Sequence, residues 1–387
     1  MDSPSLVADA ATRILKDLAD PQAINKAGDG WKKPAWAALE EAGLTLAWVP
    51  EGLGGGGAEL ADGFAALRAA GRFATALPFA ETLLAGWLLA RAGIASPKGA
   101  MTCGPVRESD TLTLGANGSL SGALRSIPFA RDAQRLAVLA RRERGGSAVV
   151  LVETSQARLT EGRSLGGDPL DALSFSRVQP VAVKDAPEGL DDRALLLMGA
   201  AVRSMQMAGA LEAILELAVG YANERVAFER PIAKFQAVQH NLARLAGEVA
   251  AAVAAAGSAA DAIASSSPPP CGEGQGVGGA PTADVRSAPP PHPSPTRGEG
   301  GLFDEAVFLE VASAKIRVGE AATEGAGIAH QVLGAIGFTQ EHILHRFTRR
   351  LWAWRDDFGS ESSWAVKLGN LVAAKGADGL WPMLAAR

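Results

Sequence analysis

Two arginines at a break in helical periodicity are the residues best suited to chemistry in this sequence. Arg225 closes a long apolar run that begins near Leu195, and Arg230 follows it directly before Pro231. Proline fixes φ and has no N–H, so a turn is expected there. Because an arginine offers a fixed fork of donors that matches a phosphate, the stretch predicts an anion site between two helices. The alternative is that Arg225 is a solvated helix end.

A second turn lies in the last third of the chain. Gln331 precedes Gly334 in the run HQVLGAIGF. Glycine lets a ligand approach the backbone closely, and the exposed N–H groups of a turn attract anions. We therefore expect a helix end here that offers donors to an anion. His342 and His345 have helical spacing, but no third well-spaced ligand accompanies them, so no metal is expected.

Composition excludes several classes of protein. The chain has 387 residues, of which 48% are hydrophobic, so it can bury the cores of two or three domains or sub-domains. A net charge of −5 disfavours a nucleic-acid binder. Only two cysteines occur, Cys103 and Cys271, which fits a cytoplasmic location without disulfides. Neither a signal peptide nor a membrane span is expected, because charges interrupt the apolar runs.

Hydrophobic periodicity divides the chain into three units. Residues 1–98 have helical spacing, whereas 99–188 contain short strand-like runs, among them 111–114, 136–139, 148–152 and 178–183. Asn117-Gly118 is a strong hairpin signal, and strands without intervening helices indicate a small antiparallel barrel or sandwich. Residues 189–387 form the third unit, with long helices typical of a bundle. The expected fold class is α+β.

The helical bundle is expected to contain one fully buried helix and an interrupted hairpin. The first helix begins after Asp191 or Asp192 and is apolar on nearly all sides, as in a core helix. Residues 265–301, rich in Pro, Gly and Ser, separate the two hairpin helices and are expected to be a disordered insertion. A Pro-rich docking site for a partner is the alternative for this segment.

The residues around both turns resemble the acyl-CoA dehydrogenase family. Residues 221–243 match its signature in order, except that Glu229 stands where the family nearly always has glycine. The run from Gln331 matches a second family pattern. The resemblance implies a helical N-terminal domain, a middle β domain, a C-terminal four-helix-type bundle and an FAD cofactor held mainly by a neighbouring subunit. It also implies the following FAD-binding residues: Arg225, Phe228, Gln236, Gln331, Gly334 and Ala335.

The family reaction requires a catalytic base, and the usual positions for it are empty. The resemblance implies α,β-dehydrogenation of an acyl-CoA thioester to the 2-enoyl-CoA, in which a carboxylate removes a proton and FAD takes a hydride. Aligned with the family, Phe358 and Gly199 occupy the two positions where a Glu is found. Asp357 and Glu361 are the nearby carboxylates that could act as the base if partly desolvated. Both could equally be solvated acids.

Three functions therefore remain open. The first is an acyl-CoA dehydrogenase that passes electrons to an electron-transfer flavoprotein or a similar acceptor, as a homo- or hetero-oligomer of two or four subunits. The second is a base-lacking subunit that completes the FAD site of a hetero-oligomer. The third is a non-enzymatic scaffold that displays the Pro-rich loop. In the middle domain, Ile127, Pro128 and Phe129 stand where many family members carry a Trp and a hydroxyl for the flavin.

Overall fold

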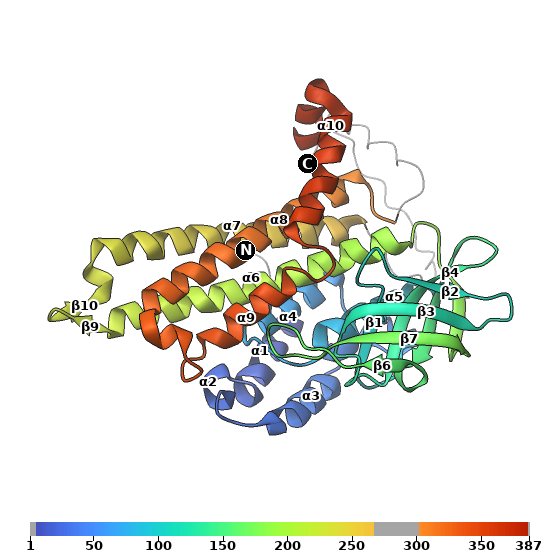
Figure 1. The fold of residues 1–387 in the computed structure, drawn as a ribbon, viewed down its shortest axis with the longest axis horizontal. Helices are drawn as coiled ribbons and strands as arrows, with labels where there is room; N and C mark the ends of the chain where they lie inside the picture. The colour runs from blue at the N-terminus through green and yellow to red at the C-terminus, as the bar shows by residue number, and fades with distance from the viewer. Residues whose placement is uncertain (1–4, 267–301, 386–387) are drawn as a thin grey trace, which may run out of the picture.

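The computed structural model describes residues 5–266 and 302–385, and Figure 1 shows its helices and sheet. Helices form the N-terminal part, a sheet follows, and long helices form the rest, so the expected α+β fold class is confirmed. The predicted insertion at 265–301 lies outside the described residues, apart from its first two, which continue a helix. The scaffold hypothesis rests on that segment.

The N-terminal helices pack around small residues. Ser5 caps the first helix by accepting a hydrogen bond from the Ala8 N–H at 3.2 Å. Gly63 allows the indole of Trp48 to lie against the fourth helix, since a Cβ there would come within 2.0 Å of the ring nitrogen. The helices are α1 (Leu6–Leu18), α2 (Pro21–Ile24), α3 (Lys32–Glu41), α4 (Leu60–Arg72) and α5 (Phe79–Arg91), with 3₁₀ turns at Asp29–Trp31, Leu44–Leu46 and Glu51–Leu53.

The middle unit is one eight-stranded sheet in the order β6-β7-β3-β2-β4-β5-β8, with β1 paired to β4. Both β1 and β2 run parallel to β4 and lie end to end along it. The strands are β1 (Met101–Gly104), β2 (Thr111–Leu114), β3 (Leu120–Pro128), β4 (Arg135–Arg142), β5 (Ser147–Glu153), β6 (Arg158–Thr160), β7 (Leu170–Val178) and β8 (Ala182–Asp185), and Thr154–Gln156 is a 3₁₀ turn.

Two strand predictions had opposite outcomes. Asn117-Gly118 does join antiparallel β2 and β3, as predicted. The strand predicted at 178–183 is wrong, because that segment spans the connection between β7 and β8. Pro180 lies in this connection and has no N–H to donate to a sheet ladder, so the pairing ends there.

The C-terminal helices form an elongated bundle beside the sheet (Figure 1). Asp191 caps the longest helix by accepting from the Ala194 N–H at 2.9 Å, so the N-cap is Asp191 rather than Asp192. The elements are α6 (Asp192–Glu224), β9 (Val226–Ala227), β10 (Arg230–Pro231), a 3₁₀ turn at Ile232–Lys234, α7 (Gln236–Ser266), α8 (Glu305–Leu333), a 3₁₀ turn η6 (Gly334–Phe338), α9 (Leu344–Trp354) and α10 (Glu361–Ala385).

Two of these helices, α6 and α7, are long and apolar enough by composition to cross a membrane. The apolar window of α6 is entirely buried within the protein, so core packing accounts for its composition, as the sequence predicts. The corresponding window of α7 is 33% buried. The expected absence of a membrane span stays a prediction.

The hairpin between α6 and α7 carries backbone strain at Glu229. Its two-residue turn places Phe228 at φ +50° and Glu229 at φ +66°, the left-handed region that favours glycine. Since a left-handed residue with a Cβ costs roughly 1–2 kcal/mol, Glu229→Gly should raise the melting temperature. The control is Glu216→Gly within α6, where glycine should lower it. A Glu229→Gly protein that melts at or below wild type would contradict the assigned turn geometry.

Candidate active site and cofactor-binding residues

The predicted functional residues fall into two groups that lie far apart. Gly199 and Arg225 bracket most of α6, and at 1.5 Å per residue they are about 39 Å apart along its axis. Figure 1 shows β9 and β10, next to Arg225, at the end of the bundle remote from the sheet. The FAD-binding group and the base group of one chain therefore cannot both reach the same flavin.

The first group is exposed at the remote end of the bundle. Arg225 is the C-cap residue of α6, and its exposed side chain forms no ion pair with the described residues. Phe228 is 89% exposed at the hairpin tip and meets Phe235 edge-on, with ring centroids 6.1 Å apart. The guanidinium of Arg230 lies 4.3 Å from the centre of the Phe235 ring, on which it stacks.

The packing of α7 against α8 brings the two turns together. Arg244 pairs with Glu324 at 2.6 Å, and Ser258 bonds Glu310 at 2.8 Å, which fixes an antiparallel register. Continued toward the remote end, this register sets the start of α7, exposed Gln236, level with the last turn of α8.

That last turn carries the second half of the predicted FAD site. Gln331 is exposed on it, and Gly334 directly follows with φ +63°, a conformation that a side chain would strain. Ala335 is exposed on the next turn. All six predicted FAD-binding residues thus lie at one end of the bundle. Exposed cationic and amide donors beside an open glycine backbone fit the phosphates of a dinucleotide.

The middle domain offers different groups from those usual in the family. Ile127 is fully buried and Phe129 is 6% exposed. Neither side chain carries a hydroxyl. The carbonyl of Pro128 accepts a hydrogen bond from Thr102 Oγ1 at 2.7 Å. The usual side-chain donors to a flavin are therefore replaced by apolar side chains on this segment.

The two usual positions of the catalytic base are in direct contact. Phe358 is 3% exposed and adopts φ +56°, which turns its ring onto α6. A Cβ added at Gly199 would come within 2.2 Å of that ring. The indole of Trp364 donates to the Phe358 carbonyl at 3.0 Å and holds the loop in place. An aromatic ring therefore fills the space that a carboxylate from either position would occupy.

Asp357 belongs to a buried network centred on Arg203. The Arg203 guanidinium donates to Asp357 Oδ2 at 2.9 Å, to Glu81 Oε1 at 2.5 Å and to Gln206 Oε1 at 2.5 Å. Side chains of Arg203 and Glu81 are 3% and 4% exposed. The network joins α5, α6 and the loop before α10, and it commits the Asp357 carboxylate to an ion pair.

Burial and charge set the ionisation of this network. Burial raises the pKa of Glu81, although Arg203 opposes the shift. Burial acts to lower the pKa of Arg203, but Glu81 and Asp357 outweigh it and raise that pKa. Nearby, Lys315 is 1% exposed and donates to the Trp354 carbonyl at 2.8 Å. Burial lowers the pKa of Lys315 to about 7.

Glu361 is also committed to a cation. It forms an ion pair with Arg355 at the start of α10. Burial acts to raise the pKa of Glu361, but hydrogen bonds from Arg355 and from the backbone, together with the charges of Arg355 and Lys315, outweigh it and leave the pKa lowered. A lowered pKa makes Glu361 a weaker base. Asp357 is held in its ion pair with Arg203, so neither carboxylate is placed as a free base.

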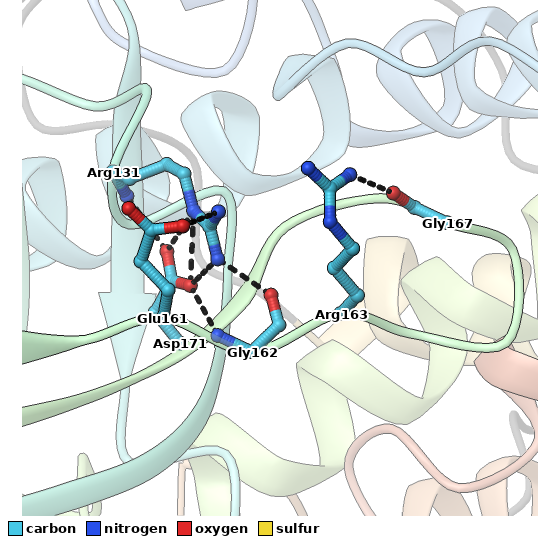
Figure 2. Close-up of polar contacts among 6 residues, drawn as sticks. All are labelled: Arg131, Glu161, Gly162, Arg163, Gly167 and Asp171. Atoms are coloured by element: carbon cyan, nitrogen blue, oxygen red, sulfur yellow. Dashed lines mark hydrogen bonds and ion pairs between the residues drawn. The ribbon is translucent and has the colours of Figure 1, made fainter.

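A buried aspartate anchors the loop between β6 and β7, as Figure 2 shows. Asp171 is fully buried and accepts from the Arg131 N–H at 2.9 Å and the Gly162 N–H at 3.0 Å. The Arg131 guanidinium also pairs with Glu161 at 2.5 Å. Farther along the loop, Arg163 donates to the Gly167 carbonyl at 3.1 Å.

The same loop docks on α9. Arg350 pairs with Asp168 at 2.6 Å, and Arg349 donates to the Leu165 carbonyl at 2.7 Å. Two arginines of α9 therefore face an acid and a carbonyl of the middle domain. His342 and His345 each form a hydrogen bond with a backbone group of their own turn.

Sequence reasoning missed Arg203 and Glu81. Arg203 is the one charged residue between Leu195 and Leu211 of α6, which is the signal that could have identified it as a buried, paired charge. Glu81 stands in the first turn of α5, where an acid is common at any helix start, so its sequence context carries no comparable signal.

Removing Arg203 should strongly destabilise the fold. Arg203→Met leaves two buried carboxylates without their shared cation, which typically costs about 3–5 kcal/mol. We expect a large fall in melting temperature. Arg244→Met, which breaks an ion pair with a 61% exposed arginine, should change it little. Equal effects of the two substitutions would show that Arg203 does not have this buried role.

Lys315 should make stability depend on pH. Its pKa is about 7 in the fold, whereas the ordinary pKa of a lysine is 10.5, so between these values the unfolded chain binds more protons. The free energy of unfolding should therefore gain from Lys315 as pH rises from about 7 to 10.5, by at most about 1.4 kcal/mol per pH unit. Denaturant unfolding at pH 7 and pH 9 should show a smaller gain in Lys315→Met. Parallel profiles would refute the assignment.

Comparison with known proteins places these features in one family. Residues 192–276 match the model of the acyl-CoA dehydrogenase C-terminal domain. The chain is 26% identical to acyl-CoA dehydrogenase IpdE2 of Mycobacterium tuberculosis over 356 residues, 89% of each protein.

Solved structures share the fold. The ChsE4-ChsE5 complex of Mycobacterium tuberculosis has a TM-score of 0.76 at 21% identity, over 97% of this chain and 100% of that one. An acyl-CoA dehydrogenase from Bacillus anthracis complexed with FAD has a TM-score of 0.69 at 18% identity, over 99% of this chain and 69% of that one. The matching domain model, the relative that spans most of the chain and the shared fold all support the acyl-CoA dehydrogenase family.

Proposed function

We propose that this chain works in the FAD-dependent α,β-dehydrogenation of an acyl-CoA thioester to the 2-enoyl-CoA, as the base-lacking subunit of a hetero-oligomer. The observation that carries the proposal is the contact between Phe358 and Gly199, because one aromatic ring fills both usual base positions. The chain's contribution would be to complete the FAD site of a partner subunit.

The surrounding carboxylates support this assignment. A general base must be free to reach a substrate proton, with a pKa near the working pH. Asp357 and Glu81 share Arg203, and Glu361 is paired with Arg355. These three carboxylates are therefore already held by arginines.

The remote end of the bundle provides the residues that would hold FAD. When bound, FAD accepts the hydride, and Arg225, Gln236 and Gln331 would hold its phosphates and adenosine portion. Because these residues lie about 39 Å along α6 from Gly199, we place the flavin they contact on a different subunit.

The nature of the assembly and its redox partner follow from the same reasoning. The ChsE4-ChsE5 neighbour is itself a complex of two differently named chains, which favours a partner of the same fold but different sequence. Reduced FAD must be reoxidised, so we propose an electron-transfer flavoprotein or a similar acceptor, with the assembly in the cytoplasm.

Separate and combined purification tests the proposal. The chain should be produced alone and together with a second acyl-CoA dehydrogenase encoded in the same genome. Each preparation is mixed with a panel of acyl-CoA esters while the visible flavin spectrum is recorded. We expect bleaching of the flavin only in the combined preparation. Rapid bleaching in the chain alone would overturn the base-lacking assignment.

A self-sufficient dehydrogenase is the second candidate. Asp357 favours it, because its side chain is 11% exposed and directly precedes the position that Phe358 fills. Asp357→Asn and Glu361→Gln distinguish the two functions in the combined preparation. The base-lacking subunit predicts flavin reduction within a few-fold of wild type in both variants. A general base contributes about 10²–10⁴-fold, so a loss of that size in either variant would favour the second candidate.

A further inference from the structure

Basic side chains gather around the first two turns of α9. They are His342, His345, Arg346, Arg349 and Arg350. The first turn of the helix has no acidic residue, although the positive end of the helix dipole lies there. Positive side chains are repelled by this end of a helix, so the cluster is unfavourable unless negative charge lies nearby.

The nearby aspartates leave part of this charge without a partner. Asp168 and Asp29 are close enough for their charges to act on Arg346. Asp168 is already paired with Arg350 at 2.6 Å. Asp29 is 83% exposed and pairs with Lys32 at 3.1 Å. Within the described residues, the half-buried Arg346 guanidinium forms no ion pair of its own.

Three polar atoms where α9 meets the loop between β6 and β7 are buried without a hydrogen-bond partner in the described part of the chain. They are Arg346 Nε, Arg350 Nε and Ser164 Oγ. Arg350 is 5% exposed, and its Nη1 donates to the Arg346 carbonyl at 3.0 Å. A Cβ added at Gly166 would lie 2.9 Å from Arg350 Cγ and 3.4 Å from Ser164 Oγ, so helix and loop meet there. Buried donors in native proteins nearly always have a partner, so these three indicate a bound group.

The ionisation of the cluster indicates that this group is an anion. Burial lowers the pKa of Arg346 to about 10, and the charge of Arg350 adds to the shift. Burial also lowers the pKa of His345, with a contribution from the charges of the neighbouring arginines. An anion at this junction would oppose both shifts, because negative charge favours the protonated forms.

We propose that Arg346, Arg350 and Ser164 bind a small oxoanion, of the size of phosphate or sulfate, between α9 and the middle domain. Guanidinium N–H groups and a hydroxyl form charge-assisted hydrogen bonds to the oxygens of such an ion. The ion supplies the missing negative charge and links the helical bundle to the loop between β6 and β7. None of the six predicted FAD-binding residues contributes to this site, and the proposal does not depend on the proposed function.

Titration calorimetry of the full chain with inorganic phosphate tests the site, with sodium chloride at the same ionic strength as the reference. The variants are Arg346→Met and Ser164→Ala. Arg244→Met is the matched control, because it removes the same charge from an exposed ion pair on α7. Proton NMR of wild type adds a local readout, since bound phosphate should raise the pKa of His345 and chloride should not.

We expect Arg346→Met to weaken phosphate binding by about tenfold or more and Ser164→Ala to weaken it a few-fold, while Arg244→Met binds as wild type does. Without phosphate, Arg346→Met should melt no lower than wild type, because it removes a half-buried cation that has no partner. Wild-type protein that does not bind phosphate, or Arg346→Met that binds it equally well, would rule the site out. A His345 pKa that phosphate leaves unchanged would do the same.

Discussion

A single buried cation joins the parts of this protein that surround the base positions. Arg203 lies inside α6, and its guanidinium contacts Glu81 from the N-terminal helices and Asp357 from the loop before α10. Charges removed from water must be paired and hydrogen-bonded, so none of the three side chains can move without leaving a buried charge unpaired. This constraint fixes the loop on which Phe358 stands. Its ring then closes over Gly199, and the space for a catalytic carboxylate is filled.

The length of α6 keeps the predicted FAD-binding residues of a chain far from the base positions of the same chain. One end of the helix meets the Phe358 loop, and the other ends at Arg225 beside the Gln331 turn. Because about 39 Å of helix lies between them, the donors at the remote end would serve, in the proposed assembly, a flavin whose ring lies on another subunit. A subunit could therefore lack a catalytic base and still complete the FAD site of a partner subunit. The high apolar content of α6 follows from the same arrangement, because the helix is buried in the core and keeps its two ends a fixed distance apart.

Much of this architecture could be predicted from the sequence, because its signals are local. The hairpin at Asn117-Gly118, the Asp191 cap and the helix break at Pro231 each depend on residues adjacent in the chain. The absence of a glutamate at the positions of Phe358 and Gly199 could also be predicted, by alignment with the family. Their mutual contact could not, because it depends on how a loop residue with φ +56° meets a helix more than 150 residues earlier. The partners of Arg203 were hidden for the same reason.

The most direct measurement of the central claim is an experimentally determined structure of the FAD-loaded assembly. We predict that the FAD phosphates lie within hydrogen-bonding distance of Arg225 and Gln331 of this chain, while the flavin ring rests on the middle domain of another subunit. A flavin held with its ring and phosphates within one chain, or a bundle end left facing solvent in every subunit, would contradict it.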